Sequence, residues 1–281
     1  MNNLTKVFKY ENENGDSIIF TPDNGYLINK PSGIDTVSVK LSTEQAINQV
    51  GATVQSINIR PRPVTVSGQI YGDLKSRKDK LLSVIRPDLS GKLFADGYYL
   101  KVYPTSTPVI GYEGYFAKFQ FSVTAPYPYW QKDAEATTVL AGMHYKFKFP
   151  WNISKTWKFA ETMETQFINV TNKGELPVPF SATFKATGEV TNPRITNVVT
   201  GKYMLLNYEM ERNESIIVKI DHDKTTVTSS INGDIRGALN LLSSLRRLAI
   251  GDNLLKPDAE AGGSGLEVSI NFAEEIVGIT L

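Results

Sequence analysis

The sequence of 281 residues lacks cysteine altogether and contains two histidines. The absence of cysteine excludes a disulfide scaffold, a thiolate metal site and a cysteine nucleophile. A zinc site needs more nitrogen or sulfur ligands than His144 and His222 supply, and the two lie far apart in the chain. We therefore expect no metal and no cofactor in this protein.

Long apolar runs are also missing. No stretch approaches the ~20 consecutive apolar residues that cross a bilayer, and no such run follows the first residues, so no signal peptide is predicted. The chain is expected to be soluble, to be made in the cytoplasm and not to insert into membranes. Its charge is balanced, with 30 basic and 29 acidic residues. Neither half of the chain has the basic excess expected of a nucleic-acid-binding protein.

What the chain does contain favours β-structure. Hydrophobic residues make up 41% and charged residues 21%, which is enough for a packed core. Apolar side chains recur at every second position in residues 36–41 and 56–60. This period of two predicts strands with one buried face. Further strands are expected at residues 64–71, 98–103, 119–123, 167–170, 180–186, 215–220, 225–228 and 266–272.

One helix is predicted in the first half, over about residues 74–86. Leu74, Leu81, Leu82 and Ile85 form a stripe along one helix face, which we expect to be buried. Asp73 can cap the start of this helix, and the proline at position 87 ends it. A second helical segment of two or three turns is predicted over residues 238–250, which carry regularly spaced leucines.

The proline-rich aromatic run over residues 125–130 interrupts the strand pattern, so we interpret it as a rigid exit from a first domain. At this length two domains are expected. The sequence predicts a mainly β protein of two β-sandwich domains, the first over residues 1–135 with the helix and the second over residues 136–281. Residues 221–224 are expected to join two strands as a hairpin loop.

Candidate catalytic groups are few. His222 lies between Asp221 and Asp223, which suggests an acid–base pair or a calcium loop, but a solvated hairpin tip explains the same residues better. Two carboxylate pairs, Glu161 with Glu164 and Glu274 with Glu275, have the residue types of a glycosidase. Nothing places either pair across a cleft, and a solvated surface is the preferred interpretation. The chain is predicted not to be an enzyme, with no catalytic, cofactor-binding or metal-binding residues.

Two clusters have the composition of binding surfaces. A basic cluster on the predicted helix is more simply a solvated surface, with a contact or channel-lining role as the alternative. An aromatic cluster in the second half has side chains that stack on sugars, although its alternating phenylalanines favour core packing. The basic cluster comprises Lys75, Arg77, Lys78 and Lys80, and the aromatic cluster comprises Tyr145, Phe147, Phe149, Trp151 and Trp157.

The order of these segments resembles the distal tail protein (Dit) family of phages with long non-contractile tails. The segments that carry the resemblance in the first half are the helix over residues 72–82, Gly91-Lys92-Leu93-Phe94, and the Pro126-Tyr127-Pro128-Tyr129-Trp130 run. Tyr127 departs from the pattern, because the family usually has an acidic residue there. In the second half they are residues 169–174, Asn192-Pro193-Arg194-Ile195, Asn232-Gly233, and residues 248–253.

The resemblance implies a structural protein of the virion, located at the distal end of the tail and assembled in the host cytoplasm. The first domain would form a hexameric ring that joins the tail tube protein to the tail-associated hub protein, with a channel through which DNA passes as cargo. The second domain would be galectin-like and would project toward receptor-binding proteins. The alternative function is a carbohydrate-binding adsorption module that uses this galectin-like domain.

Overall fold

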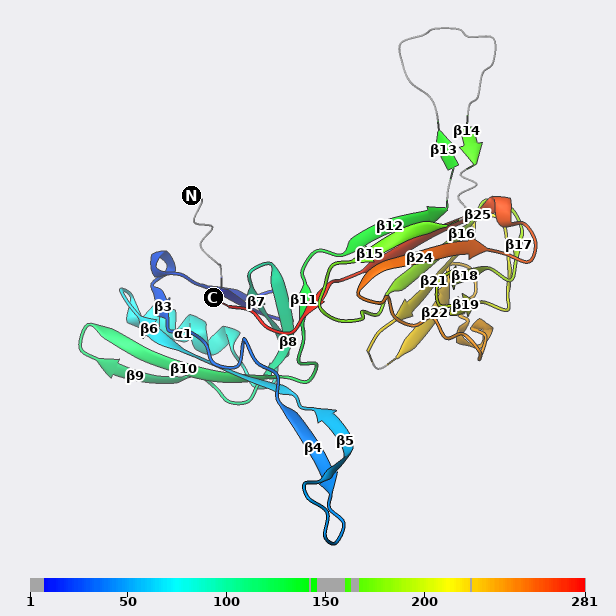
Figure 1. The fold of residues 1–281 in the computed structure, drawn as a ribbon. Helices are drawn as coiled ribbons and strands as arrows, with labels where there is room; N and C mark the ends of the chain where they lie inside the picture. The colour runs from blue at the N-terminus through cyan, green and yellow to red at the C-terminus, as the bar shows by residue number, and fades with distance from the viewer. Residues whose placement is uncertain (1–7, 142, 146–159, 163–166, 223, 281) are drawn as a thin grey trace, which may run out of the picture. The chain divides into compact units, whose positions relative to one another are not determined.

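The computed structural model describes residues 8–141, 143–145, 160–162, 167–222 and 224–280. The chain divides into two compact units: unit 1 comprises Met1–Asp133 and Glu275–Leu281, and unit 2 comprises Ala134–Glu274. Strands dominate both units, and the described residues contain a single α-helix (Figure 1). The prediction of a mainly β chain with one helix in its first half is confirmed.

Unit 1 is built around one large antiparallel sheet. Its elements are β1 (Phe8–Asn12), β2 (Ser17–Phe20), η1 (Pro22–Asn24), β3 (Tyr26–Ile28), β4 (Val39–Glu44), β5 (Thr53–Ile59), β6 (Arg62–Ile70), α1 (Leu74–Val84), β7 (Gly91–Ala95), β8 (Tyr98–Pro104), β9 (Val109–Glu113), β10 (Phe116–Ala125), β11 (Trp130–Lys132) and β26 (Glu275–Ile276). The strand order is β2-β1-β7-β8-β10-β6-β3, with β9 beside β10 and with β11 beside β8 and β26. The β4–β5 hairpin forms a separate two-stranded sheet.

The large sheet folds back on itself between β8 and β10. These strands pair only where Val123 and Thr124 meet the end of β8. Phe20 of β2 then stacks on Phe119 and Phe121 of β10, with ring centroids 5.9 Å apart in both cases. Both halves of the sheet therefore face a common core, as the inward side chains of the alternating strands require.

The helix α1 begins where the sequence predicts. Asp73 caps it, because its carboxylate accepts a hydrogen bond from the backbone nitrogen of Ser76 at 3.2 Å. The helix ends at Val84, slightly before the predicted end near residue 86, because Ile85 adopts an extended backbone. Leu81 and Ile85 are buried as expected, whereas Leu82 is only half-buried. The burial expected of Leu82 is wrong because Val84 and not Leu82 completes the apolar face.

The strands β4 and β5 correct another expectation. The alternation in residues 36–41 and 56–60 was interpreted as the sign of a buried face. Every residue of β4 and β5 is instead exposed. The two strands pair with each other and with no other strand of the described chain, so the apolar side of the hairpin has no layer to pack on.

The aromatic run after β10 is part of unit 1 rather than an exit from it. Trp130 begins β11, is fully buried, and pairs with Ile276 of β26. The predicted boundary after residue 135 lies close to the observed end at Asp133, but Glu275–Leu281 were expected in the second domain and lie in unit 1. Pairing with β11 and burial of Ile279 hold this last segment there.

Unit 2 contains two larger antiparallel sheets. Its elements are β12 (Ala136–Ala141), β13 (Met143–Tyr145), β14 (Ala160–Thr162), β15 (Ile168–Asn172), β16 (Ser181–Ala186), β17 (Val190–Thr191), β18 (Arg194–Asn197), β19 (Tyr203–Leu205), β20 (Glu209–Met210), β21 (Ser215–Ile220), β22 (Thr225–Ser229), β23 (Gly233–Asp234), η2 (Arg236–Ala238), β24 (Gly251–Asp258), η3 (Gly263–Gly265) and β25 (Leu266–Phe272). The sheet β12-β25-β16-β21-β22-β23 and the sheet β15-β24-β18-β19 share one hydrophobic core. Unit 2 is thus a second sandwich, and the loop over residues 221–224 joins β21 to β22 as predicted.

The helix predicted over residues 238–250 is not formed. The 3-10 turn η2 stands at the start of this segment. The backbone after it forms isolated β-bridges from Leu239 to Leu206 and from Leu248 to Val178. Its leucines do not share one face, because Leu245 and Leu248 are buried while Leu242 is 75% exposed. Pairing of the backbone with neighbouring strands outweighs the helical spacing of the leucines.

Candidate functional site

The structure describes only some of the predicted acid–base residues. His222 is half-buried in the β21–β22 loop, where its backbone nitrogen is hydrogen-bonded to Asp221 at 2.9 Å. Asp223 lies outside the described residues. His144 is on β13, paired in register with Glu161 of β14. Within the described ranges, no group of three His, Cys, Asp or Glu side chains is placed to hold a metal ion.

One of the two carboxylate pairs differs from expectation. Glu164 lies outside the described residues, so its position beside Glu161 stays a prediction. Glu274 and Glu275 were expected on a solvated surface, but both are buried. Glu275 is the end point of a structural network, because its carboxylate accepts hydrogen bonds from Tyr127 Oη at 2.5 Å and Gln131 Nε2 at 3.1 Å. Burial with hydrogen-bond donors explains this carboxylate as a structural group.

The basic cluster on α1 is spread over different contacts. The guanidinium of Arg77 lies against Gly25 and Gly72, where a Cβ atom would come within 2.1 and 2.3 Å of it. Both glycines have a positive φ, as turns that favour glycine do. The side chain of Arg77 therefore packs the helix against these two turns. Lys78 lies over the ring of Tyr112 at 5.7 Å. The cluster is therefore partly structural rather than one continuous basic surface.

The aromatic cluster proposed for sugar binding lies largely outside the described residues. Phe147, Phe149, Trp151 and Trp157 lie outside the described residues, and Tyr145 is placed only as part of the β13 backbone. The carbohydrate-binding alternative depends on these side chains. It therefore stays a prediction.

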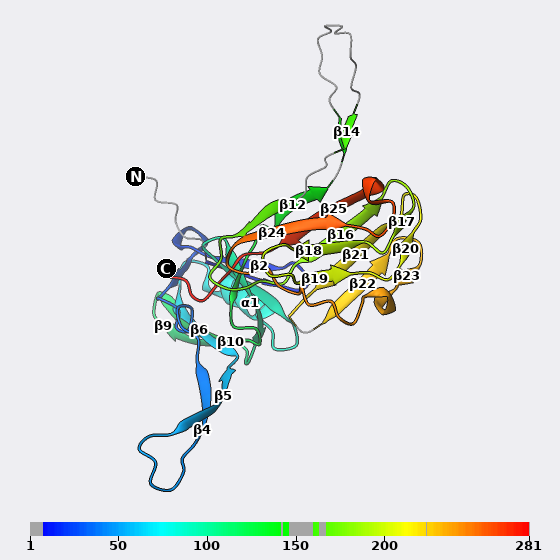
Figure 2. The same ribbon diagram turned by 45° about the vertical axis from the view of Figure 1, so that its right-hand side comes forward.

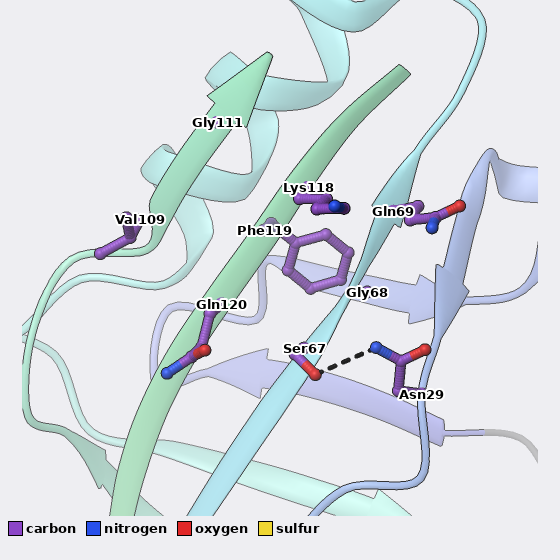
Figure 3. Close-up of a pocket in the computed structure, with 9 residues that line it drawn as sticks. All are labelled: Asn29, Ser67, Gly68, Gln69, Val109, Gly111, Lys118, Phe119 and Gln120. Atoms are coloured by element: carbon purple, nitrogen blue, oxygen red, sulfur yellow. Dashed lines mark hydrogen bonds between the residues drawn. The ribbon is translucent and has the colours of Figure 1, made fainter. Parts of the chain in front are cut away.

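A shallow depression of about 240 Å³ lies on unit 1 (Figure 3). Its walls come from β6, β10 and the residue after β3, and Gly111 of β9 leaves part of it open. Asn29 Nδ2 donates to Ser67 Oγ at 3.2 Å, and the amine of Lys118 is paired with Glu113 at 2.7 Å. No general base lies beside Ser67 among the residues that line it, so the depression does not have the composition of a nucleophilic active site.

The most distinctive surface of unit 1 is the β4–β5 hairpin, called here the arm (Figures 1 and 2). Leu41 pairs with Ile57, and Val39 pairs with Ile59, so these side chains share one face. A β-bulge after Ser42 shifts the register and brings Val54 onto the same face. Leu41 and Ile57 are 56% and 65% exposed.

The opposite face of the arm is polar. Lys40 pairs with Asn58, and Ser42 pairs with Ser56. The side chain of Gln49 orders the loop at the tip by accepting a hydrogen bond from the backbone nitrogen of Ala46 at 3.0 Å. The arm is thus an amphipathic hairpin with an uncovered apolar side, a surface typical of a protein interface.

Buried and partly buried hydrogen bonds anchor the root of the arm. The guanidinium of Arg62, which follows β5, donates to the carbonyl oxygens of Gly33 and Ile34 and to that of Val277. Burial lowers the pKa of Arg62, and the nearby charge of Asp35 opposes this effect. Arg62 is 2% exposed, so its cation joins the two ends of the arm to the last segment of the chain.

The sequence analysis missed the arm as a functional feature. Its strands were recognised, but a period of two does not distinguish an inward face from a face that another chain covers. The available signal was a set of polar residues: Ser42, Gln49, Ser56 and Asn58. They make one side of the hairpin too polar for both of its faces to be buried.

No helix in the described part of the chain has the length and apolar character to cross a membrane.

Comparisons with known proteins relate this fold to phage tails. Residues 173–275 match the family model described as "Siphovirus-type tail component, C-terminal domain". The fold is similar to the crystal structure of the Dit protein of SPP1, described as a paradigm of the hub adsorption apparatus in phages that infect Gram-positive bacteria. The TM-score is 0.70 at 17% identity, over 96% of this chain and 99% of that chain. No curated protein matches the sequence.

A second likeness is to the baseplate of phage P2 in its activated conformation. The TM-score is 0.52 with Ca, at 10% identity over 98% of this chain and 100% of that chain, and 0.50 with Sr, at 11% identity over the same shares. The resemblance predicted from the sequence is confirmed by these matches: residues 173–275 match the siphovirus-type tail component model, and the chain as a whole has a fold similar to that of the SPP1 Dit protein.

Proposed function

We propose that this protein is a non-catalytic structural component of a phage tail tip, where six copies form a ring through unit 1. The observation that carries the proposal is the arm, whose apolar face of Val39, Leu41, Val54, Ile57 and Ile59 is not covered by any of the residues that the structure describes. A two-stranded hairpin alone is marginally stable in water. The arm is therefore expected to gain its cover from a neighbouring subunit.

A ring results if the arm of each subunit packs on the next subunit. When the arm of one subunit packs on a different surface of the next, the contact is head-to-tail, and repeating it closes a ring if the rotation permits. Such a ring leaves an open axis. The near-zero net charge of +1 is compatible with DNA passing along that axis, because phosphate binding grows steeply with the number of basic contacts.

The partners proposed for the ring are the tail tube protein on one side and the tail-associated hub protein on the other. Unit 2, proposed to be galectin-like, would project toward receptor-binding proteins. The family match over residues 173–275 and the likeness to a hub protein of SPP1 support a location at the distal end of the tail.

The test is the symmetry of the assembled tail tip by electron microscopy, together with light scattering of the purified chain. Six copies of a 31.2 kDa chain would have a mass of about 187 kDa. A six-fold density, or an exact multiple of it, is expected for this subunit in the tail. Any other symmetry there would falsify the ring.

A further inference from the structure

The register of β1, β7 and β8 sorts their side chains into two faces of the sheet. Tyr10, Leu93 and Leu100 are aligned across the strands and face the core. The neighbouring rows face outward. The first outward row aligns Lys9, Phe94 and Tyr99, and the second aligns Glu11, Lys92 and Lys101. These six residues are called here the lysine–aromatic face.

Charge on this face is not balanced. Lys9 forms an ion pair with Glu11, so the carboxylate of this face is already paired. Lys92 and Lys101 are directly opposite each other on β7 and β8, and both are exposed. Neither lysine has a carboxylate partner among the described residues. Like charges directly opposite each other destabilise a strand pair, so a counter-charge supplied by a partner would stabilise this arrangement.

The aromatic rings of the face are held in place by the lysines. Lys9 Nζ lies 5.0 Å from the ring centroid of Phe94, and Lys92 Nζ lies 4.7 Å from that of Tyr99. Both rings are half-buried, so each presents part of its surface to solvent. Aromatic side chains are enriched in protein interfaces, and the polar rim of an interface accommodates lysines such as these.

Several carboxylates of unit 1 are already engaged with partners of their own, which makes them weaker counter-ions for a second copy of this face. These engaged pairs are Glu13 with Ser90, Asp35 with Lys30, Asp88 with Arg86, and Glu113 with Lys118. Duplex DNA is also disfavoured, because two uncompensated cations beside a carboxylate give few phosphate contacts.

We infer that the lysine–aromatic face is a docking surface for an acidic surface of a different protein. Carboxylates of that partner pair with Lys92 and Lys101, and its apolar side chains cover Phe94 and Tyr99. The inference does not rest on the proposed ring, because the arm and this face are separate surfaces of unit 1.

The test uses the purified full chain and labelled poly-L-glutamate as the acidic probe. Binding is measured by fluorescence anisotropy at low and at physiological salt. The K92E/K101E variant should bind roughly tenfold more weakly, because attraction becomes repulsion at both positions. K92Q/K101Q should give an intermediate loss, and unchanged thermal unfolding shows that both variants fold.

The matched control is K75E/K80E, which changes the net charge equally on exposed lysines of α1. It should leave binding within about twofold of the wild type. Equal loss in the control, or no loss in K92E/K101E, overturns the inference. A short DNA duplex that binds more tightly than the polymer through Lys92 and Lys101 also overturns it. The inference is also overturned if light scattering shows that the wild type self-associates and that K92E/K101E abolishes this association.

Discussion

Arg62 and Ile34 join the two ends of the arm, because Arg62 Nη1 donates a hydrogen bond to the carbonyl oxygen of Ile34 at 2.7 Å. The same oxygen accepts from Trp130 Nε1 at 3.0 Å and from the backbone nitrogen of Ile279 at 3.1 Å. One buried carbonyl thus connects the start of the arm, its end, β11 and the last segment of the chain. This junction holds the arm to the core of unit 1.

Arg62→Ala is expected to destabilise unit 1 by roughly 3 kcal/mol, because the carbonyl oxygens of Gly33, Ile34 and Val277 each lose a charged hydrogen-bond donor. The free energy of unfolding is measured in urea. Arg60→Ala is the control, since Arg60 is exposed at the same root and should change stability by less than about 0.5 kcal/mol. Equal effects of the two substitutions would show that the junction is not important for stability.

Deletion of residues 275–281 should destabilise unit 1 and leave unit 2 folded. The deletion removes β26, the buried Ile279 and the acceptor for Arg62 at Val277. A fragment of residues 134–274 should fold alone, and limited proteolysis should cut near both of its ends. A chain that joins Asp133 to Glu275 through a Gly-Ser linker should be folded, whereas residues 1–133 alone should expose apolar surface and aggregate.

Charges on the apolar face of the arm should prevent ring formation without unfolding the subunit. L41E/I57E places two carboxylates where a neighbouring subunit is proposed to pack. The control S42E/S56E adds the same charge on the opposite face. Light scattering should give a monomer for the first variant and leave the second like the wild type. Assembly that survives L41E/I57E would assign the contact to another surface.

Leu81→Ala should cost roughly 2–5 kcal/mol, because Leu81 is fully buried between α1 and the sheet. Leu82→Ala should cost about half as much or less, since Leu82 is half-buried. The pair of variants tests the orientation of the helix. A larger loss at Leu82, measured by thermal and urea unfolding, would require α1 to be rotated about its axis.

Unit 1 should lose stability at alkaline pH through Tyr10. Burial, with a smaller contribution from the charge of Glu13, raises the pKa of Tyr10 from 10.0 to about 12. Because the folded pKa lies above the unfolded value, the stabilisation is fully present below pH 10 and is lost as the pH rises toward about 12.

Tyr10→Phe provides the comparison. Tyr10 Oη is buried with no hydrogen-bond partner among the described residues, and the absence of a side chain at Gly91 makes room for it. The substitution should therefore change stability at pH 7 by less than about 1 kcal/mol. It should also reduce the loss between pH 10 and 12. A variant with the same alkaline loss as the wild type would exclude Tyr10 as its source.

The sequence by itself determined the strands, the capped helix and the family resemblance. These depend on local features, such as the alternation of apolar residues, the Asp73 cap and the order of turn residues, which act within a few positions of the chain. The leucines over residues 238–250 show the limit of local spacing. The backbone of Leu239 is bridged to Leu206 and that of Leu248 to Val178, both distant in the sequence. These bridges form in place of the helix.

Only the tertiary structure decided what the alternating faces contact. The strands β4 and β6 have the same period of two, yet the inward residues of β6 are buried while all of β4 is exposed. The burial of Glu274 and Glu275, and the return of residues 275–281 to unit 1, likewise depend on contacts between distant parts of the chain. Burial is set by which surfaces meet in space, and a local pattern does not contain that information.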